Sequence, residues 1–437
     1  MTTVYVFHRD LRIADNKTFT EAIQYARQTN TKLLPIFIFT PSQVTKTNPY
    51  KSDNSVQFMI DSLRDLSKQL KEHGAKLYFF YGPTDEVLLE IHEQQPIKAI
   101  FETADYTPYA KQRQLEVLSL ATFLEAEYHL IHDTYLTEPG TVLNKSGKPF
   151  QKFTPFWNTA RTRKAPEPLP LPRNISAVAA TRQPRVKSSL EERGLDKFIN
   201  SRNPDTLKGG REEGLRLLAE LPPQYDTEKD IPSKPTSYLS AHHHYGTIGI
   251  RETYHAAKKA NLARAPKGAT PLDGSLASPG NGLEAMVRQL YWRDFYGHIC
   301  NSFEELYGTS PYDYQREKMK NKYDKEALTK WQQGKTGEPM VDAAMSQLNT
   351  MGYIHNRGRL IAANYLVKTM KIFWRWGEDY FAKNLVDYDF AQNFGNWSWV
   401  ASVLPYSQAP FRGMDPKRQE EIVDSNGQYR KQWLKQA

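Results

Sequence analysis

The chain has 437 residues, 39% of them hydrophobic, which is enough to bury two separate cores. Its 58 Lys and Arg exceed its 49 Asp and Glu, and the net charge of +9 suits a polyanionic partner. The single cysteine, Cys300, excludes a disulfide framework, a cysteine zinc site and a four-thiolate iron–sulfur cluster. The sequence shows neither an apolar run of membrane-spanning length nor a signal peptide, so we expect no membrane association and no secretion.

Residues 1–136 alternate between short apolar runs and amphipathic stretches. The apolar runs are 4–7, 33–39, 76–81, 99–101 and 128–131, and helical patterns lie between them at about 16–29, 54–73, 84–94 and 109–126. Near-continuous apolar strands separated by amphipathic helices are typical of a parallel sheet with helices on both faces. We therefore predict an α/β domain over 1–136, built on a five-stranded parallel doubly wound sheet. A ligand would bind at the carboxyl ends of its strands.

The turn after the first predicted strand contains no glycine. It reads His8-Arg9-Asp10-Leu11-Arg12, whereas a dinucleotide-binding turn needs glycines so that the backbone can approach a phosphate. A standard dinucleotide site is therefore not expected in this half of the chain.

The middle of the chain reads as a connection and the rest as helices. Prolines at alternate positions from Pro166 to Pro172 predict a surface run at roughly 160–185, inside an inter-domain linker with short helices over 137–200. Helical patterns then dominate, at 237–259, 281–300, 325–332, 338–351, 355–372 and 376–385. We predict an all-helical domain over 201–437.

Several polar and aromatic clusters in the helical half have more than one interpretation. Asp387 to Trp399 combines two acids, an amide and two Trp, which indicates either a binding site or a helix end with core aromatics. The hydroxyls of Thr236 to Ser240 can cap a helix or hold a phosphate. His242 to His244 are adjacent on a predicted helix and point in different directions, so no metal site is expected. The stretches 289–296 and 355–359 read equally well as helix surfaces with salt bridges.

Taken together and in order, these motifs resemble the photolyase/cryptochrome flavoprotein family. The matching motifs are His8 to Arg12 with Asp15-Asn16, Trp331 to Gly337 with Pro339 to Ala344, and Gln432-Trp433-Leu434. The motifs are closest to class I-like cyclobutane pyrimidine dimer photolyases. Asn356 to Arg359, Asp387 to Asp389 and Gly395 to Trp397 add features of the DASH branch.

The resemblance implies that the helical domain binds FAD non-covalently, in a U shape. The implied cofactor-binding residues are Tyr225, Thr236, Ser237, Tyr238, Leu239, Ser240, Arg293, Arg359, Asp387, Tyr388, Asp389 and Asn393. Thr236, Ser237 and Ser240 would contact the pyrophosphate, and Arg359 would pair with Asp387 beside the isoalloxazine. Asn393 would face flavin N5, where plant cryptochromes have Asp and many animal cryptochromes have Cys. An amide there cannot donate a full proton to the reduced flavin, which favours a repair enzyme over a sensor.

The resemblance also implies an electron relay that photoreduces the flavin. Trp397 and Trp374 match its two inner members. The usual third Trp aligns near Asn321, and Tyr323 stands two residues further on. Because tyrosine is oxidisable when it can lose a proton, we expect Tyr323 to be the outer member.

The lesion side of the site follows from the same resemblance. The implied catalytic residues are Gln289, Trp292, Asn356, Asn393 and Trp399, and the implied DNA-binding residues are Lys229, Gln289, Trp292, Asn356, Arg357, Trp399 and Arg412. Trp292 and Trp399 would stack on a flipped-out pyrimidine dimer, and Asn356 would bind its bases. The basic residues would contact the DNA backbone without reading sequence.

Two substitutions bear on the choice of lesion, Gln289 and Leu360, the second of which replaces the Met usual in cyclobutane-dimer photolyases. Gln289 replaces the Glu of most cyclobutane-dimer photolyases and is the residue of the 6-4 branch. That branch also needs two His for acid–base chemistry, at the positions of Asn356 and Leu360, and this chain has neither. We therefore predict light-driven electron transfer from photoexcited reduced FAD to a cyclobutane dimer. A cryptochrome-type photoreceptor, a DASH-like single-strand-preferring enzyme and a 6-4 photolyase remain the alternatives.

The remaining expectations concern partners and a second chromophore. Damaged DNA is the expected partner, without a membrane or an obligate protein partner, for a monomer in the cytoplasm or wherever the DNA lies, in nucleoid or nucleus. An antenna chromophore, a folate or a deazaflavin, is an open question for the N-terminal domain. Glu102 and the stretch 105–109 lie in the family's antenna region, although a capped helix start explains them equally well.

Overall fold

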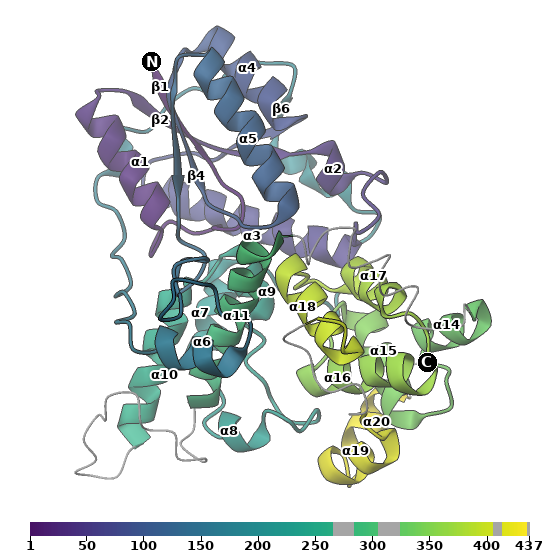
Figure 1. The fold of residues 1–437 in the computed structure, drawn as a ribbon. Helices are drawn as coiled ribbons and strands as arrows, with labels where there is room; N and C mark the ends of the chain where they lie inside the picture. The colour runs from purple at the N-terminus through teal and green to yellow at the C-terminus, as the bar shows by residue number, and fades with distance from the viewer. Residues whose placement is uncertain (265–283, 305–323, 405–412, 435–437) are drawn as a thin grey trace.

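The computed structural model describes residues 1–264, 284–304, 324–404 and 413–434. An α/β half built on the N-terminal residues lies against a helical half built on the C-terminal residues (Figure 1). The described helices include none that is both long and apolar enough to span a membrane.

The N-terminal half contains the predicted parallel sheet, with one additional strand. Its strands are β1 (Thr2–Val6), β2 (Lys32–Phe39), β3 (Tyr78–Tyr81), β4 (Ile97–Thr103), β5 (Glu127–Ile131) and β6 (Ser189–Leu190). The order is β5-β4-β1-β2-β3-β6, and the first five are parallel, as predicted. The sixth strand is antiparallel to β3 and comes from the connection between the halves, where periodicity gave no strand signal because β6 has two residues.

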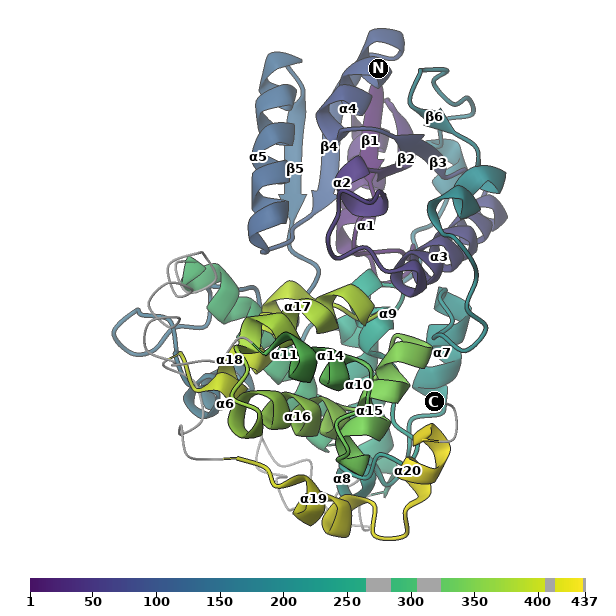
Figure 2. The same cartoon turned by 90° about the vertical axis from the view of Figure 1, so that its right-hand side faces the viewer.

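Helices cover both faces of the sheet. The helices of this half are α1 (Lys17–Gln28), α2 (Pro41–Val44), α3 (Asp53–Glu72), α4 (Thr84–Gln94) and α5 (Pro108–Phe123). Tyr5 of β1 shares a core with residues of α1 and α3, whereas its neighbour Val4 shares a core with residues of α4 and α5. Successive side chains of a strand point to opposite faces, so the sheet is doubly wound, as predicted (Figure 2).

The carboxyl edge of the sheet meets the helical half. β1 lies between β4 and β2, and beyond their carboxyl ends stand Arg9 after β1 and Asp105 after β4. Arg9 pairs with both Asp105 and Asp389 of the helical half. The Leu11 N–H donates to the carbonyl of Tyr245 at 3.1 Å. The edge at which α/β sheets bind ligands is here in contact with the second half of the molecule.

The connection is anchored to the sheet rather than running freely over the surface. It contains α6 (Phe153–Ala160), η1 (Ile175–Ala177) and η2 (Glu192–Phe198). Ile175, Val178 and Ala179 are buried, and Leu33 of β2 exchanges backbone hydrogen bonds of 2.8 Å with Val178 and Ala180. The surface run predicted at 160–185 is therefore wrong over its second half, because these apolar residues extend the N-terminal core.

The helical half is helical as predicted, but two predicted helices are broken. Its elements are α7 (Arg211–Ala219), α8 (Tyr225–Glu228), α9 (Ser240–Tyr245), α10 (Ile250–Arg264), α11 (Glu284–Ser302), α14 (Lys325–Gln332), α15 (Pro339–Met351), α16 (Asn356–Asn364), η3 (Tyr365–Thr369), α17 (Trp374–Asn384), α18 (Phe390–Ala401), α19 (Pro416–Val423) and α20 (Gln428–Trp433). Its last helices, α18 to α20, were not among those predicted. The helix predicted at 237–259 breaks at Gly246, which has φ +66°; a Cβ there would lie 2.0 Å from the carbonyl oxygen of Arg9. The helix predicted at 355–372 becomes the π-helical η3 after Asn364.

Candidate active site

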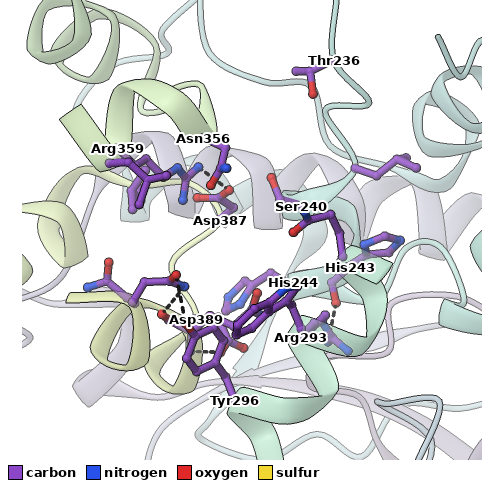
Figure 3. Close-up of a pocket in the computed structure, with 18 of the residues that line it drawn as sticks. Thr236, Ser240, His243, His244, Arg293, Tyr296, Asn356, Arg359, Asp387 and Asp389 are labelled. Carbon is purple, nitrogen blue, oxygen red and sulfur yellow. Dashed lines mark hydrogen bonds and ion pairs between the residues drawn. The ribbon is translucent and has the colours of Figure 1, made fainter. Parts of the chain in front are cut away.

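The helical half encloses a pocket of about 400 Å³ among α9, α11, α16, α18 and the segment before α9 (Figure 3). All the predicted cofactor-binding residues line it: Tyr225, Thr236, Ser237, Tyr238, Leu239, Ser240, Arg293, Arg359, Asp387, Tyr388, Asp389 and Asn393. Lys229, Gln289, Trp292, Asn356, Trp397 and Trp399 line it as well. Arg357 and Trp374 are not in its wall, and Tyr323 and Arg412 lie outside the described residues. Residues spread over much of the helical half thus meet at one cavity.

Asp387 forms an ion pair through one of its carboxylate oxygens, and its other oxygen has no described partner. Arg359 Nη2 donates to Asp387 Oδ2 at 2.7 Å, and its Nε donates to the Ile354 carbonyl at 2.9 Å. Burial alone would lower the pKa of the Arg359 guanidinium, but the Asp387 carboxylate raises it, so Arg359 keeps its charge. Asp387 Oδ1 is also buried and accepts no hydrogen bond from the described residues. It is an acceptor available to a bound molecule.

The second acid joins the two halves of the molecule. Asp389 is 4% exposed, accepts from the Gln392 N–H at 3.0 Å as the N-cap of α18, and forms an ion pair with Arg9. Burial raises the pKa of its carboxyl, but the Arg9 guanidinium outweighs burial and holds the pKa well below its usual range. Arg9 stands beyond β1, so the α/β half fixes one wall of a pocket in the helical half.

Asn393 is held by a residue that the sequence gave no reason to select. Its Nδ2 donates to Glu378 Oε1 at 2.9 Å and to the Glu378 carbonyl at 3.2 Å. Those two bonds fix the amide and leave Oδ1 without a partner among the described residues. Burial raises the pKa of Glu378 to about 7, although Arg375 at 3.2 Å opposes the shift. In the sequence, Glu378 is one acid in a helix rich in aromatic residues, and nothing near it indicates Asn393 as its partner.

The opposite end of the pocket carries free hydroxyls. α9 begins at Ser240 and no side chain caps it, so the expectation that 236–240 open a helix holds for Ser240 alone. Tyr238 has φ +51°, a left-handed conformation that bends the preceding segment. The hydroxyls of Thr236 and Ser240 have no hydrogen-bond partner among the described residues, so they can bind a ligand (Figure 3).

The three consecutive histidines are bonded to hydroxyls or sit beside the pocket. His242 Nδ1 lies 2.7 Å from Thr247 Oγ1, and His243 Nε2 lies 2.8 Å from Thr253 Oγ1. Burial lowers the pKa of all three imidazoles, so they are neutral near pH 7. The described residues contain no group of three potential ligands arranged for a metal ion.

The mouth of the pocket is aromatic and basic. Trp292 is stacked on Phe153 of α6, with ring centroids 3.6 Å apart and planes 6° apart. Phe153 belongs to the connection between the halves and carried no sequence signal for a site. Lys229 and Arg357 both pair with Asp230, at 2.9 and 2.8 Å. Among the other predicted residues, Gln289 and Asn356 are exposed, while Trp399 is partly buried.

The two predicted inner members of the electron relay are both buried. Trp397 is 3% exposed and Trp374 is 2% exposed. Trp374 packs edge-to-face on Phe394 of α18, with ring centroids 5.3 Å apart. The Arg375 guanidinium lies 5.1 Å from the Trp374 ring centroid. Both indoles are therefore shielded from water, as an internal electron relay requires.

The donor set of the pocket fits FAD. The flavin ring offers N–H groups on its pyrimidine edge. Asp387 Oδ1 is a buried acceptor without a described partner, and the described bonds of the Asn393 amide use Nδ2 and not Oδ1. The pyrophosphate and ribityl hydroxyls need donors, which the Thr236 and Ser240 hydroxyls and Arg293 provide. Aromatic and aliphatic side chains supply the apolar part of the wall.

Comparisons with known proteins show the family of the chain. A DNA photolyase family model matches residues 3–173, and the model of the FAD binding domain of DNA photolyase matches residues 286–437. The deoxyribodipyrimidine photo-lyase of Escherichia coli is 30% identical over 443 residues, which cover 99% of this chain and 89% of that protein.

Solved structures of photolyases are also similar to this chain. The photolyase of Sulfolobus tokodaii, whose crystal structure contains two FAD molecules, has a TM-score of 0.82 and 31% identity, covering 99% of this chain and 90% of that one. A bacterial class III photolyase from Agrobacterium tumefaciens has a TM-score of 0.83 and 26% identity, covering 99% and 86% of the two chains. The chain belongs to the DNA photolyase family, and its helical half is that family's FAD-binding domain.

Proposed function

We propose that this chain is a class I-like deoxyribodipyrimidine photolyase, which uses light to split cyclobutane pyrimidine dimers in DNA. The observation that carries the proposal is a single pocket that joins the predicted cofactor residues to the lesion-side residues Gln289, Trp292, Asn356 and Trp399. The relatives named deoxyribodipyrimidine photo-lyase support it over their near-full length. DNA photolyases of this family carry out light-driven DNA repair, and the +9 charge suits a DNA substrate.

Two ends of the pocket would hold FAD. Asp387 and Arg359 would bind the pyrimidine edge of the ring, because Asp387 has a buried oxygen free to accept a hydrogen bond. Thr236, Ser237 and Ser240 would bind the pyrophosphate through their hydroxyls. When bound in its reduced form, FAD supplies the light-driven electron that opens the cyclobutane ring.

Asn393 would control the proton environment beside the ring. Glu378 fixes its Nδ2, so the amide presents Oδ1, which accepts a hydrogen bond and cannot donate a proton. A neutral acceptor at this position would therefore not change the protonation state of the reduced cofactor. This favours a repair enzyme over a photoreceptor that depends on proton donation.

The lesion would bind between the mouth residues. Phe153 supports one face of Trp292, so the indole is held rigidly to stack on a flipped-out base. Gln289 and Asn356 are exposed amides that can bind pyrimidine edges. Neither is an acid, and Leu360 beside them is aliphatic, so the site has no general acid for 6-4 repair at these positions.

The rest of the chain would serve this site. We assign residues 1–136 to an antenna-type domain, 137–200 to a linker and 201–437 to the catalytic domain. A monomer without an obligate protein partner fits a substrate that is DNA alone. An antenna chromophore in the N-terminal half, a folate, a deazaflavin or a second flavin, stays open.

A repair assay tests the proposal. FAD-loaded, reduced protein is illuminated with single- and double-stranded oligonucleotides that carry either a cyclobutane dimer or a 6-4 photoproduct. Repair of the cyclobutane dimer in duplex DNA is expected. Repair confined to single strands would indicate a DASH-like enzyme, and repair of the 6-4 product would indicate that branch. Photoreduction without repair of any lesion would contradict the enzyme and favour a photoreceptor.

A further inference from the structure

We propose that Trp397, Trp331 and Tyr380 form a second electron route between the pocket and the protein surface, separate from the branch through Trp374. The inference rests on the proposed FAD photochemistry, which requires an electron donor outside the pocket. The expected outer members of the Trp374 branch lie outside the described residues. The route proposed here consists entirely of described side chains.

The three rings make consecutive contacts. Trp397 of α18 lines the pocket, and its ring centroid lies 6.2 Å from that of Trp331 on α14. The Trp331 centroid lies 5.8 Å from that of Tyr380 on α17. The contacts therefore run from α18 through α14 to α17, all within the helical half.

The environment of Trp331 suits a relay rather than an end point. Its side chain is fully buried, and its indole N–H donates to the Ala362 carbonyl at 3.0 Å. An oxidised tryptophan loses that proton only to a base or to water. A backbone carbonyl is too weak a base and water is excluded, so oxidised Trp331 keeps its proton and draws an electron from the next donor.

Tyr380 has the properties of the outer end. It is partly exposed, and its hydroxyl lies 2.7 Å from Asn349 Oδ1 and 3.0 Å from the Gln332 carbonyl. An oxidised phenol is a strong acid and would release its proton to the adjacent solvent, which prevents the electron from returning. Tyr380 thus traps the oxidation at the surface.

The charge around the two branches also differs. The Arg375 guanidinium lies 5.1 Å from the Trp374 ring centroid, and a cation there disfavours an oxidised, positively charged indole. Within the described part of the chain, no Lys or Arg lies over the ring of Trp331. Electrostatics therefore favours the Trp331 branch at the first step away from Trp397.

The electron balance needs one reductant and one oxidant. A thiolate in solution gives one electron to oxidised Tyr380 and becomes a thiyl radical, and Tyr380 takes a proton back from water. Tyr380 gives an electron to Trp331, Trp331 to Trp397, and Trp397 to the photoexcited oxidised flavin, which is the oxidant.

Photoreduction of the FAD-loaded protein under blue light with excess thiol tests the route. Trp374→Phe closes the other branch, whatever its outer member is. We expect Trp374→Phe to keep photoreducing and Trp374→Phe/Tyr380→Phe to be slower by about tenfold or more. Tyr365→Phe, which changes a partly buried tyrosine of η3, is the matched control in the same background and should have no effect.

Magnetic resonance gives a readout that packing alone does not change. Illuminated Trp374→Phe should show a tyrosyl radical whose signal narrows with ring-deuterated tyrosine and disappears in Trp374→Phe/Tyr380→Phe. Complete loss of photoreduction in Trp374→Phe with FAD bound, or equal rates with and without Tyr380→Phe, would overturn the route. Either result can occur while the wild type still repairs dimers. Conversely, the electron route can be correct in a protein that repairs no lesion. The experiments therefore distinguish failure of the electron route from failure of the proposed repair function.

Discussion

The inner wall and the mouth of the pocket are built in opposite ways. The inner wall contains Asp387 and Asp389, both buried and each paired with an arginine. The mouth contains Gln289 and Asn356, which are exposed. Buried ion pairs leave little freedom of movement, whereas exposed amides can adjust. The difference matches a cofactor that stays and a substrate that arrives, binds and leaves.

The contrast also extends to the origin of the residues. Arg9 reaches the inner wall from beyond β1, so the α/β half contributes to holding the cofactor side. The mouth receives Phe153 from the connection between the halves, behind Trp292. Four predictions test the contrast, starting with the inner wall, where the largest effects are expected.

Asp389→Ala should have the largest effect. It leaves the largely buried Arg9 guanidinium with the His244 carbonyl and the more distant Asp105 carboxylate, at 3.3 Å, and removes the cap of α18, so the free energy of unfolding should fall by about 3–5 kcal/mol. Urea unfolding and the amount of FAD retained on purification measure the change. Asp415→Ala is the matched control, because Asp415 caps α19 from an exposed position, and it should cost about 1 kcal/mol. Equal losses in the two variants would reduce the role of Asp389 to capping.

Glu378→Gln should change how stability depends on pH. The folded protein keeps the Glu378 proton up to about pH 7, whereas the unfolded chain loses it near 4.5. The contribution of the Glu378 proton to the free energy of unfolding is therefore complete below pH 4.5 and is lost as the pH rises through 7. Urea unfolding at pH 5 and pH 8 should show a decrease of roughly 1–3 kcal/mol in the wild type that Glu378→Gln removes.

The exposed acid Glu326 provides the control for that measurement. It pairs with Lys330 on the surface of α14, so Glu326→Gln should leave the pH dependence unchanged. A pH dependence that persists in Glu378→Gln would assign it to other buried acids. Asp294, whose pKa burial raises to about 7, is the first of these.

Trp292→Ala should weaken binding at the mouth without affecting the inner wall. Loss of one stacking surface should raise the Kd for dimer-containing DNA by about tenfold, a change of 1–2 kcal/mol, with FAD content unchanged. Fluorescence anisotropy with damaged and undamaged duplexes measures it. Trp157→Phe, an aromatic change beside Phe153, is the control. An equal loss for undamaged DNA would contradict the stacking role.

Arg357→Ala should give the smallest effect, visible mainly in salt dependence. Removing one phosphate contact should reduce the slope of log K against log salt by about one, for damaged and undamaged DNA alike. Asp230→Asn should act in the opposite direction, because Asp230 now competes for Arg357 and Lys229. An unchanged slope in Arg357→Ala would place this residue away from the DNA.

The sequence was sufficient to predict secondary-structure elements with clear periodicity and site residues that belong to a recognisable motif. Periodicity predicted the parallel strands and most helices, and the resemblance selected Arg359 and Asp387, which form the expected pair at 2.7 Å. It was insufficient where contacts join distant positions. Arg9 and Asp389 are 380 residues apart, and no local pattern links them.

Three further features depend on tertiary packing. Glu378 acquires its raised pKa through burial, which the acid's own neighbours in sequence do not reveal. The break at Gly246 arises from close approach to the Arg9 backbone. Phe153 becomes part of the mouth because α6 packs on α11, so its role exists in the fold and has no signature in its own segment.

The short strand β6 has a consequence for how the protein can be divided. It pairs Leu190 and Ser189 with Phe79 and Phe80 of β3, the apolar edge of the sheet. A fragment ending at residue 136 would leave that edge with unpaired backbone groups and would be prone to aggregate. A fragment ending after η2 would keep the edge covered. During synthesis, likewise, the β3 edge of the N-terminal sheet has unpaired backbone groups until the connection has left the ribosome.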